Sequence, residues 1–286
     1  ERLISWTEAK EIVTLAYTTF DIRMEKLLKP FFNNGWIDAA VKPGKAPGAF
    51  SHPTITDVHP YILLNYQGKQ RDVMTLAHEL GHGIHQTLSS SQGEILSSTP
   101  LTLAETASVF GEMLTFQTLL SQSETELARK HLLAGKVEDM INTVVRQISF
   151  YDFECRVHNE RKRGELTPNQ IGNIWLDVSK ESLGPSFKYM KGYENFWAYV
   201  PHFVHSPFYV YAYAFGDGLV NALYSVYQSG SSEFENNYFT LLSSGGSRHY
   251  SDLLKPFKLD ASDPKFWFKG LDLIISMIDE LESLQS

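Results

Sequence analysis

Apolar residues recur every three or four positions along most of the chain, which is the spacing of one face of an α-helix. The first such stretch opens with Ser5-Trp6-Thr7-Glu8. This is a capping box, in which the Ser and Glu side chains satisfy backbone N–H groups at a helix start. Apolar positions continue at helical spacing from Ala9 to Phe20. The pattern predicts a helix over about residues 6–28.

The same periodicity predicts helices over much of the remaining chain. One of them starts at Thr167-Pro168-Asn169-Gln170, where a capping box coincides with Pro at the first helical position. Residues 89–93 are rich in Ser and Gly, and we expect a flexible linker there. The predicted helices cover about residues 71–87, 101–120, 124–161, 167–183, 209–227 and 264–284.

One stretch breaks the helical pattern. Prolines and glycines recur between Pro43 and Gly68, and residues 61–66 (YILLNY) are rich in strand-forming side chains. Two or three short strands joined by turns are expected in this region. The predicted fold class is therefore mainly α, with one small β element.

Composition narrows the class of protein further. The 286 residues are 43% hydrophobic and 13% aromatic, which excludes a disordered chain. A formal charge of −8 argues against partners such as nucleic acid or an anionic membrane surface. No apolar run approaches the length of a membrane span, Cys155 is the single cysteine, and the chain opens on a helical pattern without a signal peptide. We expect a soluble, cytoplasmic protein.

The segment His78-Glu79-Leu80-Gly81-His82 is an H-E-x-x-H motif on a predicted helix. Histidines four residues apart lie one turn apart on one helix face, so both imidazoles reach a single metal ion. Glu79 lies about 100° around the helix from His78, beside the metal, where its carboxylate can take a proton from a metal-bound water. The motif predicts a zinc site with Glu79 as the general base.

A catalytic zinc site needs a third protein ligand and leaves its fourth position to water. His85 lies about 10.5 Å along the helix from His78, whereas two nitrogens on one zinc ion are about 3.3 Å apart. We therefore interpret His85 as a polar residue of the cleft or a partner of a ligand. Glu105 follows His82 after 22 residues, enough for a loop and an antiparallel helix, and we assign it as the third ligand. Glu112 is either the hydrogen-bond partner of a ligand histidine or an ordinary surface acid.

A second informative region runs from Pro201 to Tyr213 and is rich in His and Tyr. Hydrolysis of a peptide bond passes through a tetrahedral intermediate with a negative oxygen, which N–H and O–H donors stabilise. The side chains of His202, Tyr209 and Tyr211 are donors of this kind. Because alternating tyrosines cover more than one helix face, some of these rings must belong to the packed core.

Several motifs together resemble oligoendopeptidase F, a group within the thimet oligopeptidase family of zinc metallopeptidases. They are residues 59–68 (HPYILLNYQG), 71–82 (RDVMTLAHELGH), 103–108 (LAETAS), 201–203 (PHF) and 207–211 (PFYVY). The similarity extends from near Ser5 to the C-terminal helix. It implies a helical metallopeptidase lobe, with a small antiparallel β element beside the active-site helix and a narrow channel that admits short peptides.

The resemblance also implies roles for individual residues. One Zn²⁺ per chain would be held by His78, His82 and Glu105. Glu79 would be the general base, while His202 and Tyr209 or Tyr211 would lie near the scissile carbonyl. The strand around residues 48–50 would pair with the backbone of the peptide substrate by strand addition.

Members of that family are about twice as long as this chain, which resembles their C-terminal catalytic half. We treat residues 1–286 as one peptidase catalytic domain and predict a zinc-dependent metalloendopeptidase acting on short oligopeptides. One alternative is a related helical metallocarboxypeptidase, which would need a basic group for the substrate's terminal carboxylate. Another is a zinc-bearing peptide-binding fragment that is inactive without its N-terminal half.

Overall fold

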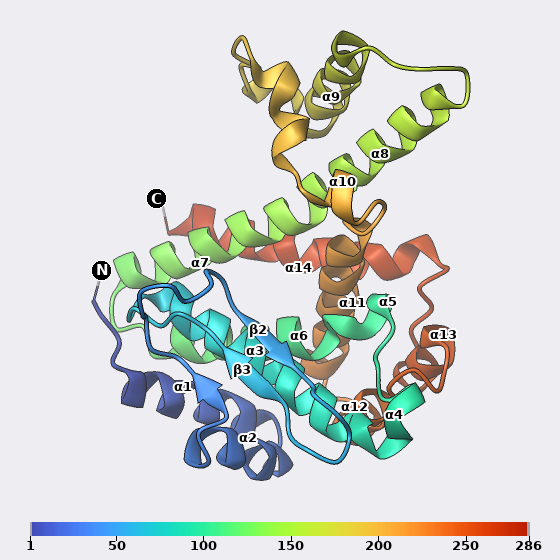
Figure 1. Cartoon of the computed structure of the whole chain (residues 1–286). Helices are drawn as coiled ribbons and strands as arrows, with labels where there is room; N and C mark the ends of the chain where they lie inside the picture. The colour runs from blue at the N-terminus through green and yellow to red at the C-terminus, as the bar shows by residue number, and fades with distance from the viewer. Residues whose placement is uncertain (1, 285–286) are drawn as a thin grey trace. The chain divides into compact units, whose positions relative to one another are not determined.

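The computed structural model describes residues 2–284, which form two compact units. Unit 1 combines residues 2–137 with 218–284, and unit 2 consists of residues 138–217. Figure 1 follows the chain through the elements of both units. The single catalytic domain over residues 1–286 stays a prediction.

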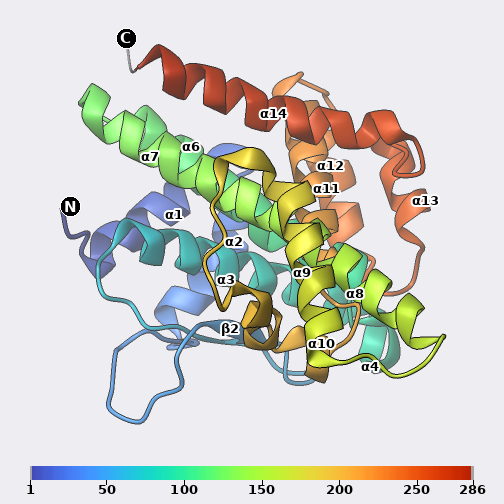
Figure 2. The same ribbon diagram turned by 90° about the horizontal axis from the view of Figure 1, so that it is seen from above.

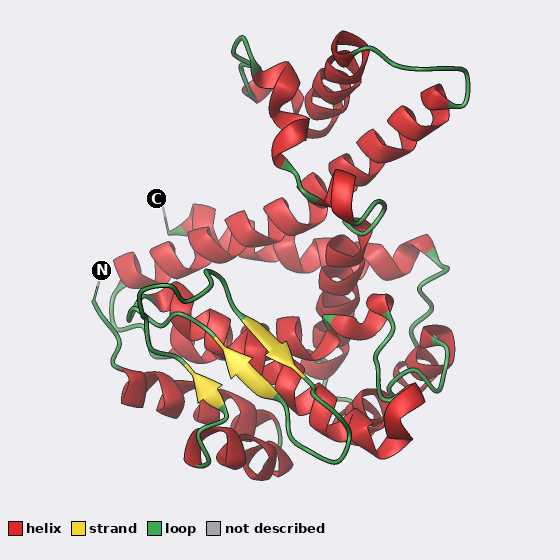
Figure 3. Ribbon diagram, viewed as in Figure 1, coloured by secondary structure: helices red, strands yellow, loops and turns green. Residues whose placement is uncertain are grey.

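Helices make up most of the two units (Figure 3), which confirms the predicted fold class. Unit 1 contains α1 (Trp6–Phe20), α2 (Arg23–Asn33), α3 (Gln70–Ser89), α4 (Gly93–Leu96), α5 (Leu101–Ala104), α6 (Thr106–Ser121), α12 (Phe234–Ser243), α13 (Tyr250–Leu254) and α14 (Pro264–Ser283). Unit 2 contains α8 (Gln147–Arg161), α9 (Pro168–Leu183) and α10 (His202–His205). Two helices, α7 (Glu126–Ile141) and α11 (Tyr211–Gln228), contribute to both units. None of the helices within residues 2–284 has both the length and the apolar character required to cross a bilayer.

The first predicted helix is two helices in the structure. Ser5 caps α1 as predicted, since its Oγ accepts a hydrogen bond from the Glu8 N–H at 3.2 Å. The helix ends at Asp21, which is extended (φ −158°, ψ 132°) and whose carboxylate accepts from the Arg23 N–H at 2.7 Å. Apolar spacing continues across this break, so periodicity alone joined α1 to α2. The structure also differs from the flexible linker expected over residues 89–93. Ser90–Gln92 form a 3₁₀ turn there.

Three short strands form one sheet in the order β1-β3-β2. Strands β2 (Phe50–His52) and β3 (Tyr61–Leu63) pair antiparallel, as expected, but β1 (Ile37–Asp38) adds a parallel partner to β3 from outside the predicted β region. The Lys45 Nζ donates to three backbone carbonyls around the sheet, those of Asp38, Ala40 and Leu64, at 2.7–2.9 Å. These bonds hold the loop between β1 and β2 against the sheet.

The core of unit 1 packs α3 closely against α6 and α1. Tyr17 of α1 is buried and donates its hydroxyl to the carbonyl of Ala77 in α3 at 2.8 Å. Gly111 of α6 is required beneath that ring, because an added Cβ would lie 1.8 Å from the Tyr17 hydroxyl. An aromatic cluster continues this core through Phe20 and Phe110, whose ring centroids are 5.2 Å apart. Elsewhere in unit 1, α14 runs beside α7 in both views (Figures 1 and 2), and Arg129 of α7 pairs with Glu280 of α14.

Unit 2 has an apolar core of its own, centred on Trp175 of α9. The rings of Phe150 and Phe153, from α8, lie 5.5 Å and 5.3 Å from it. The predicted start of α9 is confirmed, since the Thr167 Oγ1 accepts from the Gln170 N–H at 3.3 Å. These helices support the segment that carries the candidate histidine and tyrosines.

Candidate active site

Helix α3 presents His78 and His82 on one face, as their spacing predicts. Asp72 anchors the start of the helix by accepting hydrogen bonds from the backbone N–H groups of Gln67 and Lys69, at 2.8 and 3.0 Å. Gly81 lies where α6 crosses, and an added Cβ there would be 2.4 Å from the Ala107 carbonyl oxygen. This close approach brings the start of α6 next to the two histidines.

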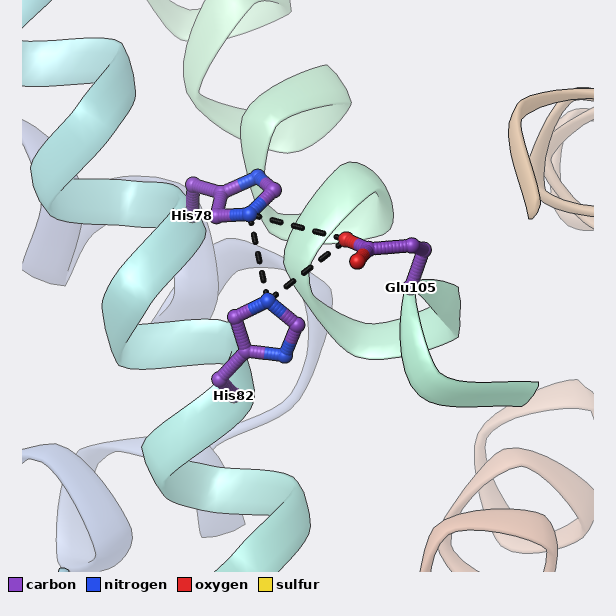
Figure 4. A group of neighbouring side chains, drawn as sticks. All are labelled: His78, His82 and Glu105. Atoms are coloured by element: carbon purple, nitrogen blue, oxygen red, sulfur yellow. Dashed lines mark hydrogen bonds and ion pairs between the residues drawn. The ribbon is translucent and has the colours of Figure 1, made fainter. Parts of the chain in front are cut away.

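Glu105 lies at a break between two helices and not inside one long helix. The sequence predicts continuous helix over residues 101–120, but Glu105 (φ −86°, ψ 0°) is both the end of α5 and the cap of α6. Ser108, which is fully buried, donates its hydroxyl to Glu105 Oε2 at 2.8 Å. The break and this hydrogen bond together direct the carboxylate toward α3 (Figure 4).

The donor atoms of His78, His82 and Glu105 all lie within 4.8 Å of one another. The two Nε2 atoms are 3.1 Å apart, and each is 3.5 Å from Glu105 Oε2. Two nitrogens bound at about 2.0–2.1 Å to one tetrahedral zinc ion are separated by about 3.3 Å. The spacing and the N,N,O donor set therefore fit a single zinc ion. No other group of three such donors within residues 2–284 meets the same spacing.

His78 is also held from outside the triad. His78 Nδ1 lies 2.5 Å from Glu112 Oε1, so Glu112 is a partner of His78 and not an ordinary surface acid. Burial alone would lower the pKa of His78, but this bond and the surrounding carboxylates raise it to about 9. Burial and the neighbouring His78 charge lower the pKa of His82 to about 4. A divalent cation would displace the His78 proton, since ligand histidines bind in the neutral form.

Glu79 lies in the same helix but is not one of the three clustered donors. Its side chain is buried, and its Oε2 has no hydrogen-bond partner within the protein. Burial raises the pKa of this carboxyl to about 7, with further contributions from Glu105 and Glu112. A carboxyl group with a pKa near neutrality both accepts and releases a proton readily, which is what general acid–base catalysis requires.

His85 is separate from this cluster. It is buried, and its Nε2 lies 3.4 Å from the Thr99 hydroxyl. Burial lowers the pKa of His85 to about 3, so the ring is neutral and packs within the core.

Unit 2 brings some of the predicted oxyanion donors together. His202 and Tyr209 have stacked rings with centroids 5.6 Å apart, and the Tyr213 hydroxyl lies 3.3 Å from His202 Nε2. Tyr211 lies in a different environment, with its ring 5.9 Å from that of Tyr151 in α8. Tyr213 was not among the candidate residues, because its contact with His202 depends on the turn between α10 and α11.

Known proteins are similar in sequence to the part of the chain that builds this site. Residues 7–273 match the sequence pattern of a known family, Peptidase family M3. The chain belongs to peptidase family M3. Its relatives include oligopeptidase PepF of Bacillus subtilis, 29% identical over 98% of this chain and 42% of that protein. The chromosomal oligoendopeptidase F of Lactococcus lactis subsp. cremoris is 30% identical over 98% of this chain and 46% of that protein.

Solved structures support the same family M3 assignment. A chain from Chlamydophila abortus, provisionally named a peptidase, superimposes with a TM-score of 0.85 at 29% identity. The match covers 99% of this chain and 48% of that one. The resemblance to oligoendopeptidase F is thus confirmed. The chain spans less than half the length of these relatives.

Proposed function

We propose that this chain carries the catalytic site of a zinc-dependent endopeptidase that hydrolyses short oligopeptides. The observation that supports it most directly is the group of three donor atoms on α3 and at the α5–α6 break, with spacings of 3.1 and 3.5 Å. His78, His82 and Glu105 would hold one Zn²⁺ per chain. The names of the relatives, oligopeptidase and oligoendopeptidase, support the substrate class.

A zinc ion held by His78, His82 and Glu105 would supply a Lewis acid, which polarises a carbonyl group and lowers the pKa of a bound water. Glu79 accepts the proton of the attacking water and delivers it to the leaving amine nitrogen as the C–N bond breaks. In the protein without a metal ion, burial raises the pKa of this carboxyl to about 7. Glu112 and Ser108 hold His78 and Glu105 in place through the hydrogen bonds described above.

The negative oxygen that develops on the substrate carbonyl needs hydrogen-bond donors. We propose His202, Tyr209 and Tyr211 for this role, supported by the similarity of residues 201–203 and 207–211 to oligoendopeptidase F. The pairing of His202 with Tyr209 in unit 2 is consistent with a shared role. A cytoplasmic location, and the lack of nucleic-acid and membrane partners, stay predictions.

The test is cleavage of a quenched fluorescent peptide of about ten residues by the zinc-loaded chain. We expect cleavage to stop when a chelator removes the metal and to return when zinc is restored. Cleavage that persists in the metal-free protein would contradict the proposal. No cleavage by the fully loaded protein would favour the alternative of a zinc-bearing fragment that is inactive without its N-terminal half. Equal rates with free and amidated peptide C-termini would separate an endopeptidase from a metallocarboxypeptidase.

A further inference from the structure

Strand β2 is one of the two edge strands of the sheet, and the directions of its N–H and C=O groups follow from the pairing. Ser51 lies opposite Ile62 in the antiparallel pair of β2 with β3. The Ile62 N–H donates to the Trp36 carbonyl at 2.9 Å, on the β1 side of β3. In an antiparallel pair, the N–H and C=O of one residue point to the same side and alternate along the strand. The N–H and C=O of Ser51 therefore point away from β3, toward the outer edge of the sheet.

The carbonyl on that edge is held by one side chain from α3. The Gln86 Nε2 donates to the Ser51 carbonyl oxygen at 3.2 Å. In return, the Ser51 hydroxyl donates to Gln86 Oε1 at 2.8 Å. A single carboxamide thus holds both the backbone and the side chain of Ser51, which is half-buried at the centre of β2.

Gln86 continues the line of the two metal-site histidines. His78, His82 and Gln86 follow one another at intervals of four residues, so they lie along one face of α3. Four residues advance a helix by about 6 Å. The outer edge of β2 is therefore tied to α3 one turn beyond His82, and Figure 1 draws β2 and β3 across this helix.

We propose that Gln86 is a positioning residue that fixes the register of a bound peptide relative to the metal site. This inference rests on the proposed function and on a substrate backbone that pairs with the edge of β2. The edge and the two histidines are joined through one rigid helix, so the hydrogen bonds between Gln86 and Ser51 set which peptide bond reaches the metal donors. Pro53 follows β2 directly and has no N–H to donate, so pairing along this edge stops at the C-terminal end of the strand.

The substitution Gln86→Glu tests this role because it keeps the size and shape of the side chain. It keeps an acceptor for the Ser51 hydroxyl, removes the N–H that binds the Ser51 carbonyl, and places negative charge beside that oxygen. Gln92→Glu is the matched control. Gln92 also donates to a backbone carbonyl, that of Ser243 at 2.9 Å, but it does not touch the sheet in any described contact.

The cleavage products of an unstructured ten-residue peptide report the register directly. We expect the wild type and Gln92→Glu to cut mainly at one bond, whereas Gln86→Glu spreads the cuts over neighbouring bonds and raises KM about tenfold. A loss of stability alone would lower the amount of active protein without moving the cut position. Identical cut positions and KM in Gln86→Glu and the control would overturn the proposal.

Hydrogen exchange separates this proposal from the proposed catalysis. If the zinc-loaded wild type cleaves no peptide, the proposed function fails, and exchange of the amides of residues 49–52 decides the positioning role. Protection of these amides by the ten-residue peptide in the wild type, lost in Gln86→Glu, supports it. The absence of such protection in the wild type overturns it.

Discussion

Glu79 is the buried carboxylate that the proposed reaction uses to move a proton. Replacing it by Gln keeps the shape of the side chain and removes the base, so kcat should fall by about 10²–10⁴-fold. Zinc content should remain one ion per chain, because Glu79 is not among the three clustered donors. Steady-state kinetics and metal analysis of Glu79→Gln measure both quantities.

The control for this prediction is Glu25→Gln, which changes an exposed carboxylate in the first turn of α2. It should leave both kcat and zinc content at the wild-type values. A Glu79→Gln variant that turns over peptide at the wild-type rate would rule out Glu79 as the base.

Ser108 orients Glu105, and its removal should weaken the metal site without removing a ligand. Ser108→Ala loses the 2.8 Å hydrogen bond to the Glu105 carboxylate. Loss of such supporting contacts weakens metal affinity by about 10–100-fold. Competition with a chromogenic zinc chelator measures the change. Ser276→Ala, in an exposed position on α14, is the control, and an unchanged zinc affinity in Ser108→Ala would contradict this role.

Residue types and spacing predict part of this site, and backbone detail decides the rest. The four-residue interval between His78 and His82 is sufficient to place both on one face, and the structure brings Glu105 to them. The role of Ser108 was not predicted, because it depends on the helix break at Glu105. Apolar periodicity carries no sign of that break.

At the scale of elements, the close crossing of α3 and α6 depends on Gly81. An added Cβ would lie 2.4 Å from the Ala107 carbonyl oxygen and 2.6 Å from the Ser108 Cα, both backbone atoms of α6. Forcing the helices apart should lower the free energy of unfolding by about 1–3 kcal/mol. It should also weaken zinc binding, because Glu105 is carried on the same segment. Denaturant unfolding and zinc titration of Gly81→Ala test both effects.

Gly135→Ala is the matched control for this prediction. Gly135 lies inside α7, and an added Cβ there meets nothing within 4 Å. Because Ala favours helix over Gly, this change should raise the free energy of unfolding by about 0.5–1 kcal/mol. If Gly81→Ala had the same free energy of unfolding as Gly135→Ala, the close contact between α3 and α6 would not be required for stability.

The elements that the sequence predicts well are long helices with clear start signals. The helix starting at Pro168 and the active-site helix match the structure within two residues at either end. The break at Asp21 was missed because a capping side chain inside an apolar repeat does not alter its period. Strand β1 was missed because two residues, Ile37–Asp38, are too few to show alternation. It is held in place by its parallel partner β3 and by Lys45, contacts made only in the folded protein.

At the scale of the whole molecule, the candidate residues divide between the two units. The three clustered donors and Glu79 belong to unit 1, whereas His202, Tyr209 and Tyr211 belong to unit 2. The segments that match the family extend through both units, from residue 7 to residue 273. The proposed metal binding and the proposed oxyanion stabilisation can therefore be tested separately on the same chain.

Zinc should stabilise unit 1 selectively, because every clustered donor comes from α3 or the α5–α6 break. A ligand at 100 times its Kd stabilises the state that binds it by about 2.7 kcal/mol, which corresponds to about 100-fold. We therefore expect zinc to slow amide hydrogen exchange in α3 and α6 by up to about 100-fold, relative to chelator-treated protein. Exchange in α9 should stay nearly constant.

In His82→Ala the effect of zinc should disappear from α3 and α6. Equal slowing of α9 by zinc would mean that the two units open together or that the metal binds elsewhere, and the His82→Ala variant distinguishes these outcomes.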